Sequence, residues 1–309
     1  AAASWKKSDA MTAPAVAVLG GGVAGLACAY RLSELSQEQG FPLNIHIFEA
    51  SPRFGGILET EKRDGFLLEK GPDAFLTEKP WAMDLARRLG LEDQLIWTRP
   101  EARQSFIVQN DHLIPTPEGF YLIAPLKTAP FLLSPLFSAA GKLRMLAESY
   151  IPSRAGDRDE SIADFVQRRF GRECLERAGQ PMLAGIFTGA PENLSLDACL
   201  PRFHDLEKKY GSLTRALKKE KEAKKASGPR YGLFASFKDG MQRLTDTLKG
   251  RLEISSLHSD SMVSSLSYET SRQRWMVHLE KGGTFEASAV CCALPSRVSA
   301  KILQEGFPA

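Results

Sequence analysis

The chain has 309 residues, of which 43% are hydrophobic and 25% are charged, a balance typical of a globular protein with one large or two medium domains. The formal net charge of +3 at pH 7 gives no electrostatic argument for a nucleic-acid partner, and the sequence contains no nucleic-acid-binding motif. The five cysteines are an odd number without CxxC spacing, which disfavours a disulfide framework and a metal centre and favours a reducing compartment.

The first 14 residues lack the continuous apolar region of a signal peptide, and Met11 stands just before the first predicted strand. This leader is not assigned to the fold, and a cytoplasmic location is expected.

The first predicted elements form a strand–helix–strand unit with a glycine-rich turn. A strand over residues 15–19 runs into Gly20-Gly21-Gly22-Val23-Ala24-Gly25, a helix extends to about Gln39, and a strand over residues 43–48 ends at Glu49. Gly20 permits the tight turn, Gly22 lets a pyrophosphate approach the backbone, and Gly25 lets the helix pack closely on the strand. The helix N-terminus offers N–H groups to phosphate, and Glu49 is placed to accept hydrogen bonds from ribose hydroxyls. The pattern predicts an ADP-containing dinucleotide.

A second glycine motif narrows the dinucleotide to FAD. The run Glu49-Ala50-Ser51-Pro52-Arg53-Phe54-Gly55-Gly56 resembles the signature of FAD-binding amine oxidase-like flavoproteins, in which the glycine pair passes close to the flavin pyrophosphate. Arg53 is expected to supply charge-assisted hydrogen bonds there. An NAD-binding enzyme or regulator has no reason to carry this pair. The cofactor residues predicted from the two motifs are Gly20, Gly22, Val23, Ala24, Gly25, Glu49, Ala50, Arg53, Gly55 and Gly56.

The middle of the chain is predicted to be mainly helical. Before it, residues 66–69 form a short predicted strand, residues 81–89 an amphipathic helix, and residues 106–108 and 112–114 a hairpin. The apolar stretch over residues 120–137 is interrupted by Lys127 and by prolines, so it predicts no transmembrane span. Three interpretations of this stretch stay open: the lining of an apolar substrate pocket, a patch that dips into one membrane leaflet, and a buried core segment.

Two helical signals follow. Ser161 is the predicted N-cap of a helix that buries Ile162, Phe165, Val166 and Phe170. The charged residues 208–225 include interleaved glutamates, which favours a solvated helix or a mobile loop over a tail that binds anionic lipid or nucleic acid.

The last third of the chain predicts a helix over residues 241–248 and then strands over residues 251–254, 262–266, 274–279 and 285–291. Three successive strands suit a small antiparallel meander beside a flavin domain. A helix over residues 296–303 ends the pattern.

Four later segments, in order after the glycine-rich opening, resemble the oxygen-dependent protoporphyrinogen oxidases of haem synthesis and their bacterial coproporphyrinogen-oxidising relatives. They are residues 65–80, 183–196, 209–213 and 237–244, and the resemblance covers roughly residues 13–303. It implies a non-covalently bound FAD and a porphyrinogen held in an apolar cavity. It also implies removal of six electrons in three two-electron steps, with oxygen as the acceptor and hydrogen peroxide as the product.

The resemblance implies further site residues. Gly71 and Pro72 match a segment near the flavin ring, and Val263 matches a position that meets the adenine through its backbone, with a plain core valine as the alternative. Arg103 or Ser105 matches an arginine that binds a substrate propionate in plant relatives, with an exposed arginine as the alternative. No catalytic residue and no metal ligand is assigned.

The expected architecture is α/β: a Rossmann-like FAD-binding domain with an antiparallel β-meander, and a mainly helical domain that holds the substrate and contacts a membrane peripherally. The expected boundaries are residues 13–90 for the first part of the FAD-binding domain, 91–205 for the helical domain, and 206–309 for the return to the FAD and substrate regions. Expected partners are a porphyrinogen, oxygen, a second copy of the chain and, as receiver of the product, ferrochelatase.

Two alternatives remain. A related amine oxidase or carotenoid desaturase shares the opening motif, although residues 71–73 and 183–190 argue against it. The second alternative concerns length. The family's chains are longer and carry a late glycine-rich segment that closes the flavin site, so this sequence is either a partial record of a longer protein or an inactive fragment that lacks part of its FAD site.

Overall fold

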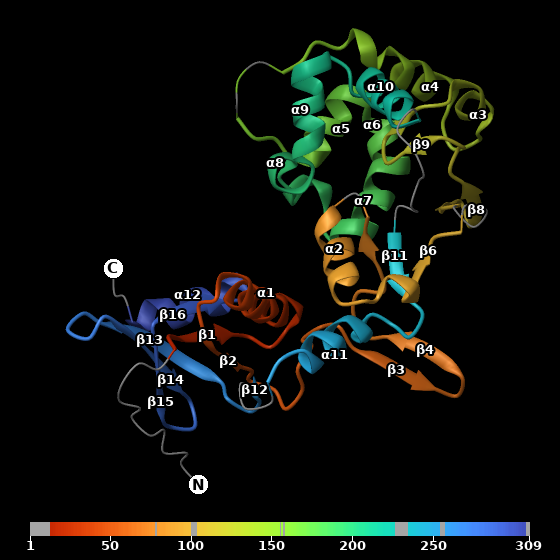
Figure 1. The fold of residues 1–309 in the computed structure, drawn as a ribbon. Helices are drawn as coiled ribbons and strands as arrows, with labels where there is room; N and C mark the ends of the chain where they lie inside the picture. The colour runs from red at the N-terminus through yellow and green to blue at the C-terminus, as the bar shows by residue number, and fades with distance from the viewer. Residues whose placement is uncertain are drawn as a thin grey trace. The chain divides into compact units, whose positions relative to one another are not determined.

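The computed structural model describes residues 13–77, 79–99, 104–154, 156, 158–225, 234–253 and 257–306. The chain divides into two compact units, unit 1 with residues 1–98 and 231–309, and unit 2 with residues 99–230 (Figure 1). These boundaries differ from the expected ones at residues 90/91 and 205/206. Strand β6 (Leu95–Trp97) pairs with β11 (Phe234–Phe237), and helices α9 (Pro201–Tyr210) and α10 (Leu213–Lys225) pack into the core of unit 2.

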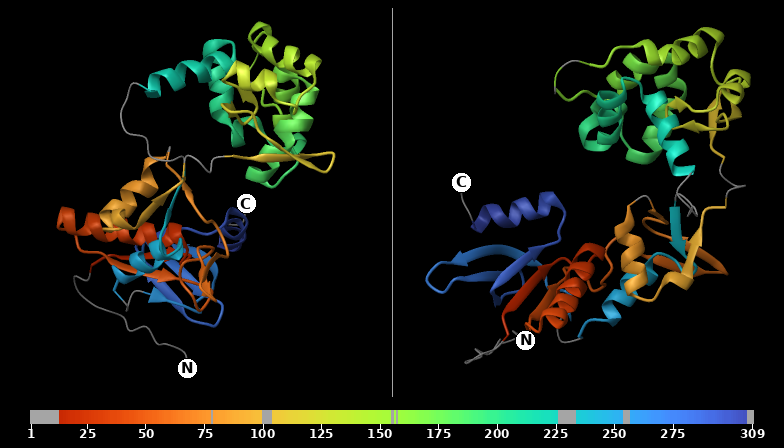
Figure 2. Two further views of the ribbon diagram at one scale, coloured as in Figure 1. Left: turned by 90° about the vertical axis from the view of Figure 1, so that its right-hand side faces the viewer. Right: turned by 45° about the horizontal axis from the view of Figure 1, so that its top comes forward.

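The centre of unit 1 is a parallel sheet with the strand order β12-β2-β1-β16. Strand β1 (Ala15–Leu19) leads through helix α1 (Val23–Gln39) to β2 (Asn44–Phe48), as the sequence predicts. Helix α1 ends at Gly40, whose φ of +64° provides the left-handed C-cap. The outer strands β12 (Leu257–His258) and β16 (Ala289–Cys292) come from the other end of the chain. Both views of Figure 2 show these blue segments beside the red β1–α1–β2 segment.

Strand β1 is buried on both faces, and successive side chains of a strand point to opposite sides. Val18 and Ile47 pack with α1 in one core, whereas Ala17, Leu19 and Phe48 pack with the meander in another. Burial on both faces explains the continuous apolar run of β1. The predicted Rossmann-like α/β class is confirmed.

The predicted meander is present, but its last strand was predicted too long. Strands β13 (Val263–Glu269), β14 (Arg274–Leu279) and β15 (Thr284–Ala287) form the antiparallel layer, and helix α12 (Ser296–Gly306) follows. The predicted single strand over residues 285–291 is wrong, because the chain changes sheets at Ser288. The Ser288 N–H donates to the Ala15 carbonyl at 2.7 Å, and β16 then runs parallel to β1.

The strand predicted over residues 251–254 is also wrong where the structure describes it. Residues 251–253 form a turn after helix α11 (Gln242–Gly250), and residue 254 lies outside the described residues. The parallel pairing with β2 begins only at Leu257.

The remaining elements of unit 1 include a small antiparallel sheet of order β5-β11-β6 and a separate hairpin of β3 with β4. They are β3 (Thr60–Arg63), β4 (Phe66–Glu69), β5 (Phe75–Leu76), α2 (Pro80–Arg88) and the short η1 (Glu92–Gln94).

Unit 2 is mainly helical around one apolar core. Its hairpins are β7 (Phe106–Gln109) with β8 (His112–Pro115), as predicted, and β9 (Phe120–Tyr121) with β10 (Ala124–Pro125). Its other elements are α3 (Thr128–Leu133), α4 (Ala139–Leu146), η3 (Ala147–Tyr150), α5 (Ile162–Phe170), α6 (Arg172–Cys174), η4 (Leu175–Gly179), α7 (Gln180–Phe187), η5 (Pro191–Asn193) and α8 (Leu196–Cys199).

Two predictions for unit 2 are confirmed. The Ser161 hydroxyl accepts the Asp164 N–H at the start of α5, and the four apolar side chains predicted for that helix are buried. The charged segment is helical: it covers the end of α9 and all of α10, in which Arg215 and Lys219 are exposed and Leu213, Ala216 and Leu217 are buried.

The apolar stretch over residues 120–137 belongs mostly to the core. Ile123, Phe131 and Leu136 are fully buried. Leu132 and Leu133, in contrast, are 46% and 86% exposed. Among the described residues, no helix has both the length and the apolar character needed to cross a membrane.

A buried ion network that the sequence did not predict organises unit 2. The Arg169 guanidinium is fully buried and contacts the carboxylates of Glu148 and Glu207. Glu148 also accepts the Ser212 hydroxyl at 2.6 Å and the Leu213 N–H at 2.9 Å, so it caps the start of α10. Removal of one partner from such a network leaves an unpaired buried charge, which is strongly destabilising.

Candidate cofactor site

The candidate site lies at the carboxyl ends of β1 and β2, where the first glycine turn leads into α1. Gly20 has a φ of +102° and its N–H donates to the Phe48 carbonyl at 2.9 Å. A side chain at Gly25 would place its Cβ 1.8 Å from the Gly20 carbonyl oxygen, so α1 can approach β1 only with glycine there. The roles predicted for these glycines in the turn and in helix packing agree with this geometry.

The N-terminus of α1 has the character of an anion site. Its N-cap residue, Gly22, has no side chain to cap the first turn, and that turn contains no acidic residue. Val23 is half-buried and Ala24 is exposed at the helix start. Backbone N–H groups and the positive end of the helix dipole are therefore the local features that favour a phosphate.

Glu49 follows β2 and closes the first glycine turn. Its carboxylate accepts the Gly21 N–H at 2.6 Å and the Ser51 N–H at 2.9 Å. A carboxylate oxygen has a further lone pair, so these bonds leave acceptor capacity for a ribose hydroxyl. Ala50, the next residue, is exposed.

Gly21 is a residue that the sequence reasoning missed. Its hypothetical Cβ would lie 2.5 Å from the Phe54 ring and 2.9 Å from the Glu49 Cβ, so no side chain fits. The dinucleotide fingerprint assigns roles to the flanking glycines only. The signal that could have found it is the unbroken run of three glycines.

The second glycine pair joins the first turn through the backbone. Gly55 and Gly56 have φ values of +115° and +59°, a conformation that favours glycine at both positions. The Gly55 N–H donates to the Gly21 carbonyl at 2.8 Å, and a Cβ on Gly56 would lie 3.0 Å from the Gly22 Cα. The two motifs, separated in the sequence by a helix and a strand, thus form one continuous glycine surface.

Arg53 contacts the loop that follows it. Its Nη1 donates to the carbonyls of Phe54 at 3.2 Å and Leu58 at 3.1 Å, and its Nη2 donates to the Gly56 carbonyl. Its Nη2 also lies 3.2 Å from the Glu59 carboxylate. The predicted direct bond from Arg53 to a pyrophosphate stays a prediction.

Gly71 and Pro72 lie next to this loop. A Cβ on Gly71 would approach the Ile57 carbonyl oxygen to 2.0 Å, so the chain passes in direct backbone contact with the residue after the glycine pair. The Lys70 N–H donates to the Glu59 carbonyl at 2.8 Å and fixes this approach.

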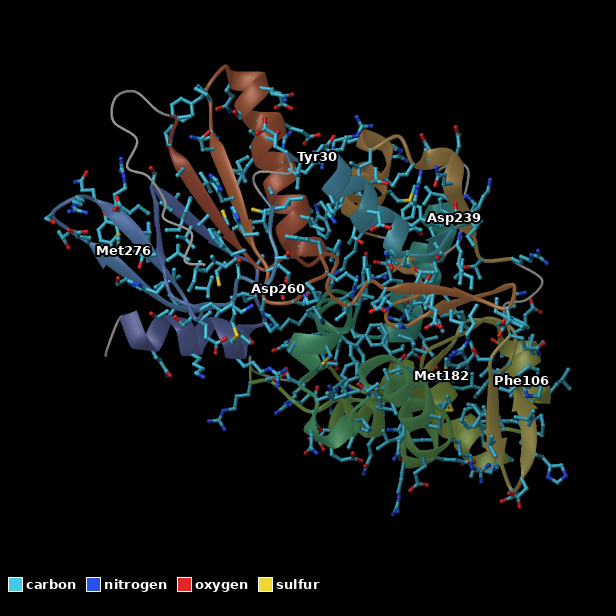
Figure 3. The ribbon with its side chains drawn as sticks, turned by 90° about the horizontal axis from the view of Figure 1, so that it is seen from below. Tyr30, Phe106, Met182, Asp239, Asp260 and Met276 are labelled. Carbon is cyan, nitrogen blue, oxygen red and sulfur yellow. The ribbon has the colours of Figure 1, made fainter. Side chains whose placement is uncertain are left out.

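The residues just before Val263 are hydrogen-bonded to the loop that follows β2. The Glu49 N–H donates to the His258 carbonyl at 2.9 Å, and the Ser261 N–H donates to the Glu49 carbonyl at 2.8 Å. Asp260, labelled in Figure 3, donates its N–H to the Ser51 carbonyl at 3.1 Å. The Val263 side chain is buried in the core, as the core-valine interpretation expects, and the predicted contact of its backbone with adenine is untested.

A pair of histidines lies on neighbouring strands of the parallel sheet, His46 on β2 and His258 on β12. The His46 Nδ1 is 3.0 Å from the His258 Nε2, and the rings stack with centroids 5.3 Å apart. Burial lowers the pKa of both imidazoles below the ordinary value of 6.5, and His46 lowers the pKa of His258 further. A neutral pair can share one N–H···N hydrogen bond, whereas two imidazolium rings cannot.

The predicted substrate residues lie in unit 2. Arg103 lies outside the described residues. Ser105 is exposed, and its carbonyl accepts the Thr116 N–H at 2.9 Å. Within the described part of the chain, no group of three or more His, Cys, Asp or Glu residues could hold a metal ion.

Comparison with known proteins gives consistent matches. The model of a family described as flavin containing amine oxidoreductase matches residues 23–309. The chain is 33% identical over 293 residues to the coproporphyrinogen III oxidase of Bacillus subtilis, covering 94% of this chain and 62% of that protein. It is 30% identical over 283 residues to protoporphyrinogen oxidase 2, chloroplastic/mitochondrial, of Arabidopsis thaliana, covering 86% of this chain and 53% of that protein.

Solved structures show the same likeness. A putative protoporphyrinogen oxidase from Exiguobacterium sp. 255-15 superposes with a TM-score of 0.78 at 27% identity, covering 96% of this chain and 63% of that one. A putrescine oxidase superposes with a TM-score of 0.63 at 17% identity, which is a likeness of fold alone. The chain therefore spans between half and two thirds of the length of these relatives.

Proposed function

The chain belongs to the flavin-containing amine oxidoreductase family, and from this premise we propose that the whole protein oxidises a porphyrinogen to the porphyrin in haem biosynthesis. The substrate is coproporphyrinogen III or protoporphyrinogen IX. The observation that carries the proposal is the sequence likeness, over nearly the whole chain, to proteins named coproporphyrinogen III oxidase and protoporphyrinogen oxidase.

FAD is the cofactor of the site, and the residues present fit it. Gly21 and Gly25 have no room for side chains. Helix α1 starts within the same glycine turn, and no side chain caps its first N–H groups. The adenosine and pyrophosphate would lie along the turn from Gly20 to Gly25, with Glu49 accepting ribose hydroxyls. Bound FAD would supply a two-electron acceptor, and oxygen would be the final oxidant, which is reduced to hydrogen peroxide.

The protein's own contribution is orientation of the two reactants. Gly55, Gly56, Gly71 and Pro72 would shape the path along the cofactor, and unit 2 would hold the macrocycle with Arg103 or Ser105 near a propionate. No side chain of the chain is assigned a proton transfer.

We also propose peripheral membrane contact through unit 2. Val108 and Leu113 face each other across the β7–β8 hairpin, and each is 69% exposed; Phe106, labelled in Figure 3, is 53% exposed on the same face. Exposed apolar groups of this kind favour an interfacial partner. Homodimer formation and transfer of the product to ferrochelatase rest on the resemblance alone.

The test of the activity is a comparison of two substrates with the full gene product. Freshly reduced coproporphyrinogen III and protoporphyrinogen IX are incubated with the protein in air, and porphyrin fluorescence and hydrogen peroxide are recorded together. We expect porphyrin formation well above the spontaneous rate, with peroxide in proportion. Rates equal to the spontaneous ones, or turnover of putrescine instead, would contradict the proposal.

A further inference from the structure

We infer that Arg53, Glu59 and Lys70 form a positioning network, through which Arg53 shapes the second glycine loop instead of binding the cofactor phosphates itself. The inference rests on the use of this site for FAD. It concerns how the site is held together.

The first observation is the convergence of carbonyl groups on one guanidinium. The carbonyls of Phe54, Gly56 and Leu58 all accept hydrogen bonds from Arg53. In a trans peptide the N–H points away from the carbonyl of the same unit. The N–H groups of Gly55 and Ile57 therefore point away from the guanidinium, and that of Gly55 reaches the Gly21 carbonyl of the first turn.

The second observation is that the charge of Arg53 is already matched. Glu59 places one carboxylate oxygen 3.2 Å from the Arg53 Nη2 and the other 2.8 Å from the Lys70 Nζ. The hydrogen bond from Lys70 lowers the pKa of the Glu59 carboxyl, so this group is ionised at neutral pH. A guanidinium with three carbonyl partners and a carboxylate has little capacity left for a phosphate.

The third observation connects the network to the next cofactor segment. Lys70 is bonded to Glu59 twice, through its N–H and through its ammonium group, and Gly71 comes directly after it. The backbone contact of Gly71 with Ile57 then holds the predicted flavin-ring segment against the glycine loop. One carboxylate, Glu59, thus links the Arg53 loop to the Gly71–Pro72 segment.

The network is not expected to stabilise the fold strongly. The side chains of Arg53, Glu59 and Lys70 are 37%, 35% and 50% exposed. Ion pairs of this exposure are weakened by water and salt. A change in FAD affinity can therefore be separated from a change in folding.

The experiment titrates FAD into the apoprotein and follows quenching of flavin fluorescence for the wild type, Glu59→Gln and Arg53→Lys. Positioning predicts that both substitutions weaken FAD binding, on the order of fivefold or more, as expected for coupled neighbouring groups. The lysine retains the positive charge but cannot reach three carbonyls. The melting temperature of each apoprotein should stay close to that of the wild type.

Direct phosphate binding by Arg53 predicts the opposite sign. Glu59→Gln would then remove a negative charge near an anionic ligand and free the guanidinium, so FAD would bind equally well or more tightly, and Arg53→Lys would retain most of the affinity. Either result overturns the inference. Failure of the wild-type protein to bind FAD would instead contradict the proposed function.

Glu61→Gln is the matched control. Glu61 lies 3.2 Å from the Lys70 Nζ, and its substitution removes the same charge two residues away without touching Arg53. We expect unchanged FAD affinity. A loss equal to that of Glu59→Gln would show that net charge, not the link to Arg53, controls binding.

Discussion

At the scale of single residues, Gly25 gives the most direct test of the site. In Gly25→Ala the Cβ would lie 1.8 Å from the Gly20 carbonyl oxygen, and because backbone lies on both sides, α1 must shift away from β1. We expect a loss of about 1–3 kcal/mol in the free energy of unfolding and a marked loss of FAD affinity, measured by urea unfolding and by FAD titration.

Gly250→Ala serves as the control for this substitution. A Cβ at Gly250 would meet nothing within 4 Å, and the residue has no positive φ. Equal losses in the two variants would contradict the claim that close packing of α1 on β1 makes glycine necessary.

Most residues of the candidate site could be predicted from the sequence, because the conformation and close approach of the backbone require glycine at these positions. A glycine required for a turn or a close approach leaves a local pattern, so Gly20, Gly25, Gly55 and Gly56 were predictable. Gly21 was missed because its constraint comes from Phe54, a residue far along the chain. The contacts of Arg53 were equally hidden, since they depend on which carbonyls a loop turns inward.

At the scale of elements, local signals predicted the helices well and the final strands poorly. The cap at Ser161 and the apolar period that follows it belong to one short segment. The division of residues 284–292 between two sheets depends on Ala15, at the opposite end of the chain. Alternating apolar residues suit either sheet, so the position of the change could not be inferred from the sequence.

The β12–β2 pairing predicts a dependence of stability on pH. Burial lowers the pKa of His46 and His258 in the folded protein below 6.5, so the unfolded chain binds protons that the folded chain resists. The contribution is complete above about pH 6.5 and is lost as the pH falls below it. When the pH is lowered from 7.5 to 5.5, we expect the melting temperature of the wild type to fall by roughly a few degrees more than that of His258→Gln.

His112→Gln is the comparison for this prediction. His112 is exposed on the β7–β8 hairpin and takes no part in the pair. This variant should retain the full pH dependence of the wild type; an unchanged profile in His258→Gln would contradict a role for the pair.

At the scale of the whole molecule, the two units should be separable for cofactor binding. Unit 2 leaves after β6 and returns before β11, and these strands are paired, with Ala235 opposite Trp97. Replacement of residues 99–230 by a short Gly-Ser linker should leave a folded unit 1. We expect it to bind FAD with an affinity within about tenfold of the parent chain, because all of the predicted cofactor residues lie in unit 1.

Porphyrinogen oxidation should be absent from this shortened protein, because the predicted substrate residue, Arg103 or Ser105, is removed with unit 2. Circular dichroism measures whether unit 1 is folded, and FAD titration measures its affinity for the cofactor. A shortened protein that folds but does not bind FAD would place essential cofactor contacts in unit 2.

The parallel sheet has a consequence for biosynthesis. Strand β1 ends at Leu19 and its neighbour β16 begins at Ala289, so β1 leaves the ribosome long before β16 is made. At translation rates of about 5–20 residues per second, one edge of β1 waits on the order of tens of seconds for its partner. An open strand edge is prone to wrong pairing during that interval. The nascent chain is thus expected to depend on chaperones until residues 289–292 are made.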